Sequence, residues 1–195
     1  MARTSMVAPL VFAHMNVAPV QSDLYRLVKT LVVAATGLDP ALVIQGQPNR
    51  AAMPAASPGF AMMQATATKR LRTNQDSWAG LAPVSLATEQ GTQVRMQLDL
   101  YGANAGDWAV ILSTLLRSEY ACTILAGADP TAPVCQPLYS GDPFQGPLDD
   151  SEAQYESRWT VEAVLQYNPV TTVPQDFADT LSVTLINVDV TYPPS

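Results

Sequence analysis

Side chains that could do chemistry are few in this chain and lie far apart in the sequence. One of its 195 residues is a histidine, His14, so a Ser-His-Asp arrangement would have to use it. The sequence contains no Gly-x-Ser-x-Gly turn to expose a nucleophile. It also contains neither the GxxxxGK[ST] loop that binds phosphates nor a GxGxxG segment that opens a helix. We therefore expect neither nucleophilic nor nucleotide-dependent catalysis.

Carboxylates form one local group, Asp149, Asp150 and Glu152. Two such groups could bind Ca²⁺ or act as an acid and a base. They lack the spaced oxygen ligands of a calcium loop, and a solvated acidic turn is the simpler interpretation. Zinc would need about four nitrogen or sulfur ligands, and the chain offers two cysteines and a distant histidine. The sequence therefore predicts no catalytic residues and no metal site.

Cys122 and Cys135 are close enough in sequence for a disulfide. The first twenty residues carry only Arg3 as positive charge and are interrupted by Pro9, so we expect no signal peptide. No segment reaches the roughly 18 uninterrupted apolar residues of a membrane span. Reduced thiols in a cytoplasmic compartment, with no membrane partner, are the default expectation.

The composition predicts one domain, residues 1–195, that buries much of its surface against other subunits. Charged residues make up 14% of the chain, whereas about a quarter is usual. A domain with so little charge has fewer polar side chains to cover its surface, which favours an oligomer. An alanine-rich composition alone could give the same percentages.

The net charge of −7 argues against a dedicated nucleic-acid binder. Such proteins need Lys and Arg to replace the counterions of phosphate. The one basic cluster, Lys69-Arg70-Leu71-Arg72, is interpreted as a solvated strand end. An acidic surface beside DNA would repel it and keep it mobile.

Apolar residues at helical spacing predict two helices. The first covers 22–35, with Ser22 as its N-cap and Gly37 in the left-handed position after its end. The second covers 104–118, with Asn104 as a cap. The second helix carries an apolar stripe that we expect in the core, namely Trp108, Ile111, Leu112, Leu115 and Leu116.

The predicted fold is α+β, with these two main helices on a mainly antiparallel sheet of about four to five strands. Residues 93–101 and 156–167 alternate between apolar and polar side chains, which is typical of strands with one buried face. Gln90-Gly91 is interpreted as a weak hairpin turn, and Pro174 could begin a single helical turn through Ala178. The strands are expected at 60–72, 84–88, 93–101, 156–167 and 180–191.

Three stretches lack a regular pattern: a possible N-terminal arm, 1–19, and extended loops at 45–59 and 126–151. Both loops are rich in proline and alanine. Loops of this length are uncommon in a compact domain unless they have a function or are disordered. We interpret them as contacts between subunits or with stacked proteins, while a tolerated surface loop remains the alternative.

Several longer patterns carry a resemblance to a known family. They are Leu100-Tyr101-Gly102 running into the Trp108 helix, Tyr139-Ser140-Gly141-Asp142-Pro143, Gln166-Tyr167-Asn168-Pro169-Val170, and the closing Leu185 to Val190. Together they resemble the neck or tail-terminator proteins of tailed bacteriophages. The resemblance is strongest over 98–118, 138–143 and 154–194, and weaker over the first sixty residues.

The resemblance implies a structural virion protein of the phage neck, assembled in the bacterial host cytoplasm. Such subunits form a ring, usually a hexamer, that caps the tail tube and offers a platform to head-completion proteins. The ring leaves a channel through which DNA passes without specific binding. Neither enzyme activity nor a cofactor is implied. The alternatives are another phage morphogenesis protein, such as a tail tube or head-closure protein, and an enzyme that uses surface carboxylates.

The candidate interface residues lie in or beside the two long loops. They are Gln47, Asn49, Arg50, Met53, Asp142, Phe144, Asp149 and Asp150.

Overall fold

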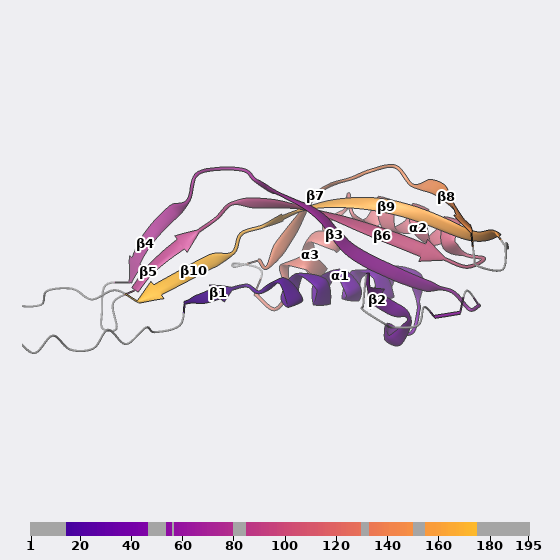
Figure 1. Ribbon diagram of the computed structural model, residues 1–195, viewed down its shortest axis with the longest axis horizontal. Coiled ribbons are helices and arrows are strands. Elements are labelled where there is room, and N and C mark those ends of the chain that lie inside the picture. The colour runs from indigo at the N-terminus through magenta and orange to yellow at the C-terminus, as the bar shows by residue number, and fades with distance from the viewer. Residues whose placement is uncertain are drawn as a thin grey trace, which may run out of the picture.

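The fold is α+β, as predicted, but it has two sheets (Figure 1). The computed structural model describes residues 15–46, 54–55, 57–79, 85–129, 133–149 and 155–174. The helices are α1 (Gln21–Thr36), the short 3-10 helix η1 (Pro40–Leu42), α2 (Ala105–Leu115) and α3 (Glu119–Ala126). The strands are β1 (Asn16–Ala18), β2 (Val43–Gln45), β3 (Phe60–Arg70), β4 (Gln75–Ala79), β5 (Ser85–Glu89), β6 (Thr92–Tyr101), β7 (Cys135–Ser140), β8 (Phe144–Asp149), β9 (Tyr155–Tyr167) and β10 (Val170–Pro174).

The larger sheet has the order β2-β3-β6-β9-β7, with β8 also paired to β9. Only the β2–β3 pair is parallel among the pairs of this sheet that the described residues form. The predicted alternation of β6 and β9 is confirmed, because Val94, Met96 and Leu98 are buried and so are their partners on β9. One face of the sheet packs against the three α-helices, which closes the core.

Helix α1 begins one residue earlier than predicted, and its N-cap is Val20 rather than Ser22. The reason is that Asp23 accepts a hydrogen bond from the Val20 backbone N–H, at 3.2 Å, and so fixes the first turn. The end was predicted correctly. Gly37 adopts the left-handed conformation, and its N–H donates to the Val33 carbonyl.

The predicted second helix, 104–118, corresponds to α2, which ends at Leu115, and α3 is a further helix that the sequence analysis missed. Trp108 and Leu112 are buried as expected, but Ile111 is exposed, so its assignment to the core was wrong. Residues Ala105, Trp108, Ala109 and Leu112 already face the sheet, which turns Ile111 toward the outside of the helix.

The prediction of a long loop at 126–151 was wrong for much of its length. Strands β7 and β8 lie there, end to end along the same edge of β9, with Gly141–Pro143 between them. Pro137 and Pro147 misled the interpretation, because proline opposes a central strand but is tolerated on an edge strand. In the described part of the chain, β7 and β8 pair only with β9. On the side of these strands away from β9 there are therefore no backbone hydrogen bonds between strands for a proline to remove.

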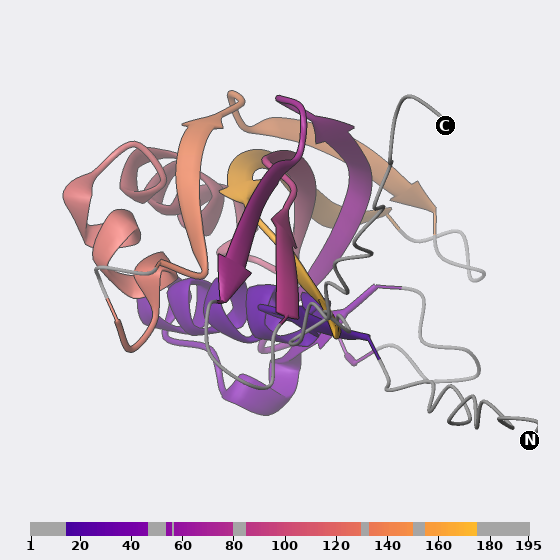
Figure 2. The ribbon, with the colours of Figure 1, turned by 90° about the vertical axis from the view of Figure 1, so that its left-hand side faces the viewer.

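The smaller sheet, in the order β1-β10-β5-β4, is called here the β-arm. It prolongs the larger sheet, because β3 continues into β4, β5 into β6, and β9 into β10. The breaks are bridged by hydrogen bonds from Leu71 N–H to the Gly91 carbonyl and from Gln90 N–H to the Pro169 carbonyl. Gln90-Gly91 is therefore a bend between two sheets, and the predicted hairpin turn was wrong. Figure 1 shows the β-arm extending away from the helices, and Figure 2 shows it end-on.

Several predictions lie wholly or partly outside the described residues. These are the strand at 180–191, the helical turn after Pro174, most of the N-terminal arm and residues 47–53 of the first loop. Within the described part of the N-terminal arm, residues 16–18 form β1.

Candidate functional site

The residues that could have done chemistry are not brought together in the described structure. His14, Asp150 and Glu152 lie outside the described residues, and Asp149 ends β8, where it pairs with Tyr155. Among the described residues, no group of three or more His, Cys, Asp or Glu side chains could hold a metal ion. The carboxylates and thiols of the described residues are therefore spread over separate elements.

The two cysteines are both free thiols. Cys135 is buried at the start of β7, where its Sγ lies 3.5 Å from the Leu125 carbonyl oxygen. Burial raises the pKa of Cys135 to about 12, because the apolar surroundings penalise the thiolate. Cys135 is therefore protonated at neutral pH and is a packing residue rather than a nucleophile.

A buried carboxylate, Asp99 on β6, lies on the sheet face opposite the helices. It is 2% exposed and forms an ion pair with Arg158 on β9. Thr160 donates a hydrogen bond of 2.6 Å to Asp99 Oδ1, and Gln97 donates one of 2.8 Å to Oδ2. Since the carboxylate oxygens are so fully hydrogen-bonded, this group joins two strands and has no vacant position for a ligand.

The sheet edge formed by β7 and β8 carries two of the predicted interface residues. Asp142 and Phe144 lie at the Gly141–Pro143 break, where the Asp142 side chain is 95% exposed and Phe144 is 56% exposed. Arg117, which follows α2, donates to the Ser140 carbonyl at 2.7 Å and to Asp142 at 3.3 Å. This contact holds the segment between β7 and β8 against the end of α2. The candidates Gln47, Asn49, Arg50, Met53 and Asp150 lie outside the described residues.

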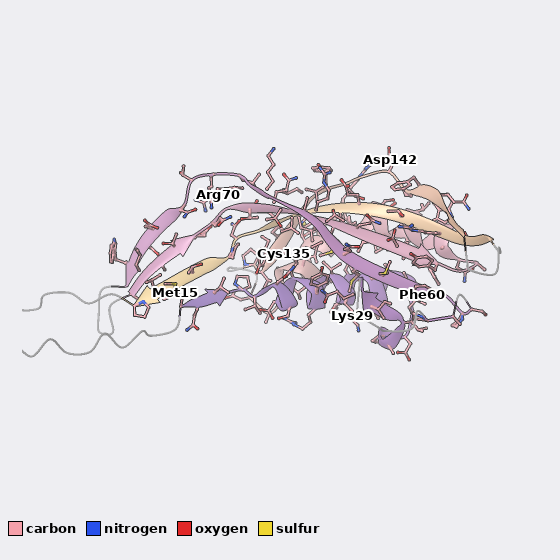
Figure 3. The ribbon with its side chains drawn as sticks, viewed as in Figure 1. Met15, Lys29, Phe60, Arg70, Cys135 and Asp142 are labelled. Carbon is pink, nitrogen blue, oxygen red and sulfur yellow. The ribbon has the colours of Figure 1, made fainter. Side chains whose placement is uncertain are left out.

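Large exposed apolar side chains of the described residues fall into two groups that lie on different elements. The first, the arm patch, lies on the β-arm and at its base, and comprises Met15, Val17, Val20, Leu71 and Trp78. The second, the flank patch, comprises Val110, Ile111 and Tyr120 on the outer side of α2 and α3, and Leu138, Tyr139 and Phe144 on the edge strands β7 and β8. Tyr139 and Phe144 pair with Val164 and Thr160, so they lie on the sheet face opposite the helices. Figure 2 shows α2 and α3 beside β7 on one side of the molecule, and Figure 3 shows Met15 far from Asp142.

The charges beside the two patches differ in sign. Lys69, Arg70 and Arg72 are exposed where β3 passes into the β-arm, which confirms the predicted solvated strand end. Arg72 forms an ion pair with Glu89 at this bend. Asp107 and Glu119 are exposed in the first turns of α2 and α3, beside the apolar residues of the flank patch. The described structure thus presents a basic arm base and an acidic flank.

Hollows in the described surface are small. One of about 280 Å³ lies where the two sheets meet and is lined by Leu24, Val94 and Tyr167, among others. The pKa of Tyr167 is raised by burial, with smaller contributions from Asp23 and Cys135, and its hydroxyl donates to the Pro19 carbonyl. This arrangement ties the segment before α1 to β9.

No single helix among the described residues is long and apolar enough to cross a membrane. Helices α2 and α3 together would meet the requirements of length and composition, but they meet at an angle of 84°. Their inward residues belong to the core described above.

A comparison with known families was informative. The family model described as phage neck terminator protein matches residues 22–189 of this chain. A comparison with curated proteins found no match. The matched residues include α2, α3 and the β-arm strands β4, β5 and β10, but not β1.

Proposed function

Because this chain belongs to the phage neck terminator protein family, we propose that it forms a closed ring that caps the tail tube. The family match supports a structural role in the neck of the virion. In the proposed role, one face of the ring contacts the last ring of the tube and the other receives the head-completion proteins. Assembly takes place in the cytoplasm of the bacterial host, and six subunits per ring are the expected number.

The observation that carries this proposal is the presence of two different apolar surfaces on one subunit. Contact between unlike surfaces is head-to-tail, and such contacts close into a ring when the rotation between neighbours permits. A subunit with a single self-complementary surface would instead favour a two-fold dimer. The arm patch and the flank patch share no residues and lie on different elements.

Termination of the tube follows from having unlike faces. A growing tube adds rings because each ring exposes a face that binds the next. A ring that matches this face but presents a different opposite face stops the stacking. In this role the protein needs shape and binding surfaces, and it needs neither a cofactor nor a catalytic group.

Passage of DNA through the ring is consistent with the charge of the chain. Each subunit carries a net charge of −7, and an acidic channel would repel the phosphates and keep the DNA mobile. We expect a neutral or acidic channel surface and no measurable binding to duplex DNA at about 0.15 M salt. Tight, salt-dependent binding would contradict this part of the proposal.

The function is tested by adding the purified protein to polymerising tail-tube protein of the same phage. Capping predicts shorter tubes as the ratio of terminator to tube protein rises, with the protein found only at tube ends in electron micrographs. Labelling along the tube wall would favour the alternative of a tube protein. Binding only to the head-completion protein would favour a head-closure protein.

A further inference from the structure

We propose that the β-arm of one copy lies against the flank patch of the next copy and so closes the ring. This inference rests on the proposed ring and adds to it the two surfaces that meet. The occupant of each patch is a second copy of this chain, joined head to tail.

No described residue outside the β-arm packs as a layer over either of its faces. None of its described residues whose exposure is defined is buried, although the same strands are buried where they continue into the larger sheet. Its register places Trp78 beside Leu86 and Leu86 beside Val173, which makes an apolar row across three strands. A small sheet is stable when an apolar face is covered, so this row needs a partner.

The body of the same copy does not provide that cover. Figure 1 shows the β-arm projecting away from the helical layer, and α2 and α3 lie behind the other part of the sheet. Among the element pairs in repeated contact, the strands of the β-arm contact one another and none of the helices. Within the described part of the chain, no helix covers the arm patch, which leaves it as a candidate surface for a neighbouring molecule.

The flank patch has the matching chemistry. Val110 and Ile111 lie on the outer side of α2, and Tyr120 lies on α3. The acidic side chains Asp107 and Glu119 adjoin them, whereas Lys69 and Arg70 lie at the base of the β-arm. Apolar contact at the centre with opposite charges at the rim is the usual composition of a specific interface.

Two charge-reversed variants test this pairing. The arm variant carries Lys69→Glu and Arg70→Glu, and the flank variant carries Asp107→Lys and Glu119→Lys. All four residues are exposed, so both variants should keep the far-UV spectrum of the wild type. The flank variant should melt at a lower temperature, because Asp107 and Glu119 lie in the first turns of α2 and α3, where a positive charge opposes the helix dipole. At low ionic strength, of about 0.05 M, each variant alone should show at least a fivefold lower fraction of rings, because like charges then meet across the junction.

Mixing the two variants gives the sharpest result. The acidic arm of the first then meets the basic flank of the second, and the basic arm of the second meets the acidic flank of the first. The 1:1 mixture should therefore restore alternating rings to within about twofold of the wild type. A matched control for the arm variant, Arg26→Glu with Lys29→Glu on α1, makes the same change in net charge at two residues that belong to neither patch and should leave the ring fraction unchanged.

The outcomes separate this inference from the proposed function. If the wild type forms rings but the variants also form them normally, or the mixture fails to restore them, the arm-to-flank contact is wrong while the ring stands. If the wild type forms no rings at all, both proposals fail. Loss of rings in the α1 control to the same extent would also overturn the arm-to-flank contact.

Discussion

Arg158 on β9 forms two hydrogen bonds with the buried Asp99 on β6. Nε lies 3.3 Å from Oδ1 and Nη2 lies 3.1 Å from Oδ2. The pair joins the two central strands of the larger sheet on the face that the helices do not cover. A few residues away on the same face, Arg95 and Glu162 form an ion pair across the same strands, but both side chains are more than a third exposed. The two pairs are therefore a natural comparison of buried and exposed ion pairs.

Replacing Arg158 with alanine should destabilise the protein by about 3 kcal/mol, because Asp99 is left buried without its charged partner. For a chain of this length, that loss lowers the melting temperature by roughly 6–12 °C. Arg95→Ala should change the free energy of unfolding by less than about 0.5 kcal/mol, since an exposed pair is screened by solvent. Urea unfolding of both variants measures the difference, and equal losses would show that burial of Asp99 does not matter.

Gly59 should not tolerate a side chain. Its φ is +113°, and an added Cβ would lie 2.7 Å from the Tyr101 carbonyl oxygen and 2.8 Å from the Trp108 ring. Gly59→Ala should therefore cost about 3 kcal/mol from backbone strain and overpacking. Gly37→Ala is the matched control, because Gly37 also has a positive φ but has open space around its Cβ position. It should cost only about 1 kcal/mol, and equal thermal shifts would rule out the contact with Trp108.

Cys135 should make stability fall at high pH. Burial raises its pKa from 9.0 to about 12, so above pH 9 the unfolded chain loses this proton while the folded chain keeps it. Between these values, the free energy of unfolding should fall by about 1.4 kcal/mol per pH unit more in the wild type than in Cys135→Ala. Urea titrations at several pH values measure the two slopes. Parallel slopes would mean that the thiol is not protected by burial.

The sequence was sufficient to predict those helices and strands that bury one face along their whole length. The alternation of β6 and β9 and the stripe of α1 each report a single covered face, so these elements and the α+β class could be predicted. Of the β-arm, β5 was predicted, as the strand at 84–88, but the sheet itself was not. β4 has only exposed side chains among those described, and β5 and β10 are half-buried on both faces. Their role depends on pairing with distant strands, which local periodicity does not encode.

The flank patch was only partly predictable. Asp142 and Phe144 were expected at an interface because their segment is rich in proline. Val110 was not considered, and Ile111 was placed in the core, since helical spacing alone cannot show which part of a wide apolar surface meets the sheet. Leu138 was missed as well. It is the extra residue at the irregularity between Pro137 and Tyr139, and such bulges are not visible in composition.

The loop residues proposed as contacts can be tested without disturbing the core. Phe144→Ser combined with Asp142→Ser should leave the melting temperature within about 2 °C of the wild type, because surface substitutions change stability little. The same variant should reduce assembly with the neck and tail proteins at least fivefold, as measured by co-sedimentation. Shortening the segment 47–53, which contains Gln47, Asn49, Arg50 and Met53, should act in the same way. Normal particles from both variants would show that these loops are tolerated insertions.

The most direct test of the central claim is the mass and symmetry of the purified full-length protein. Native mass spectrometry combined with negative-stain electron microscopy gives both quantities from one preparation. The ring account predicts a single closed species, with a mass of six times the 20.9 kDa subunit and a central opening. A closed ring of another subunit number would correct the stoichiometry alone. A monomer at all concentrations, a two-fold dimer or an open filament would contradict the claim that unlike surfaces close this chain into a ring.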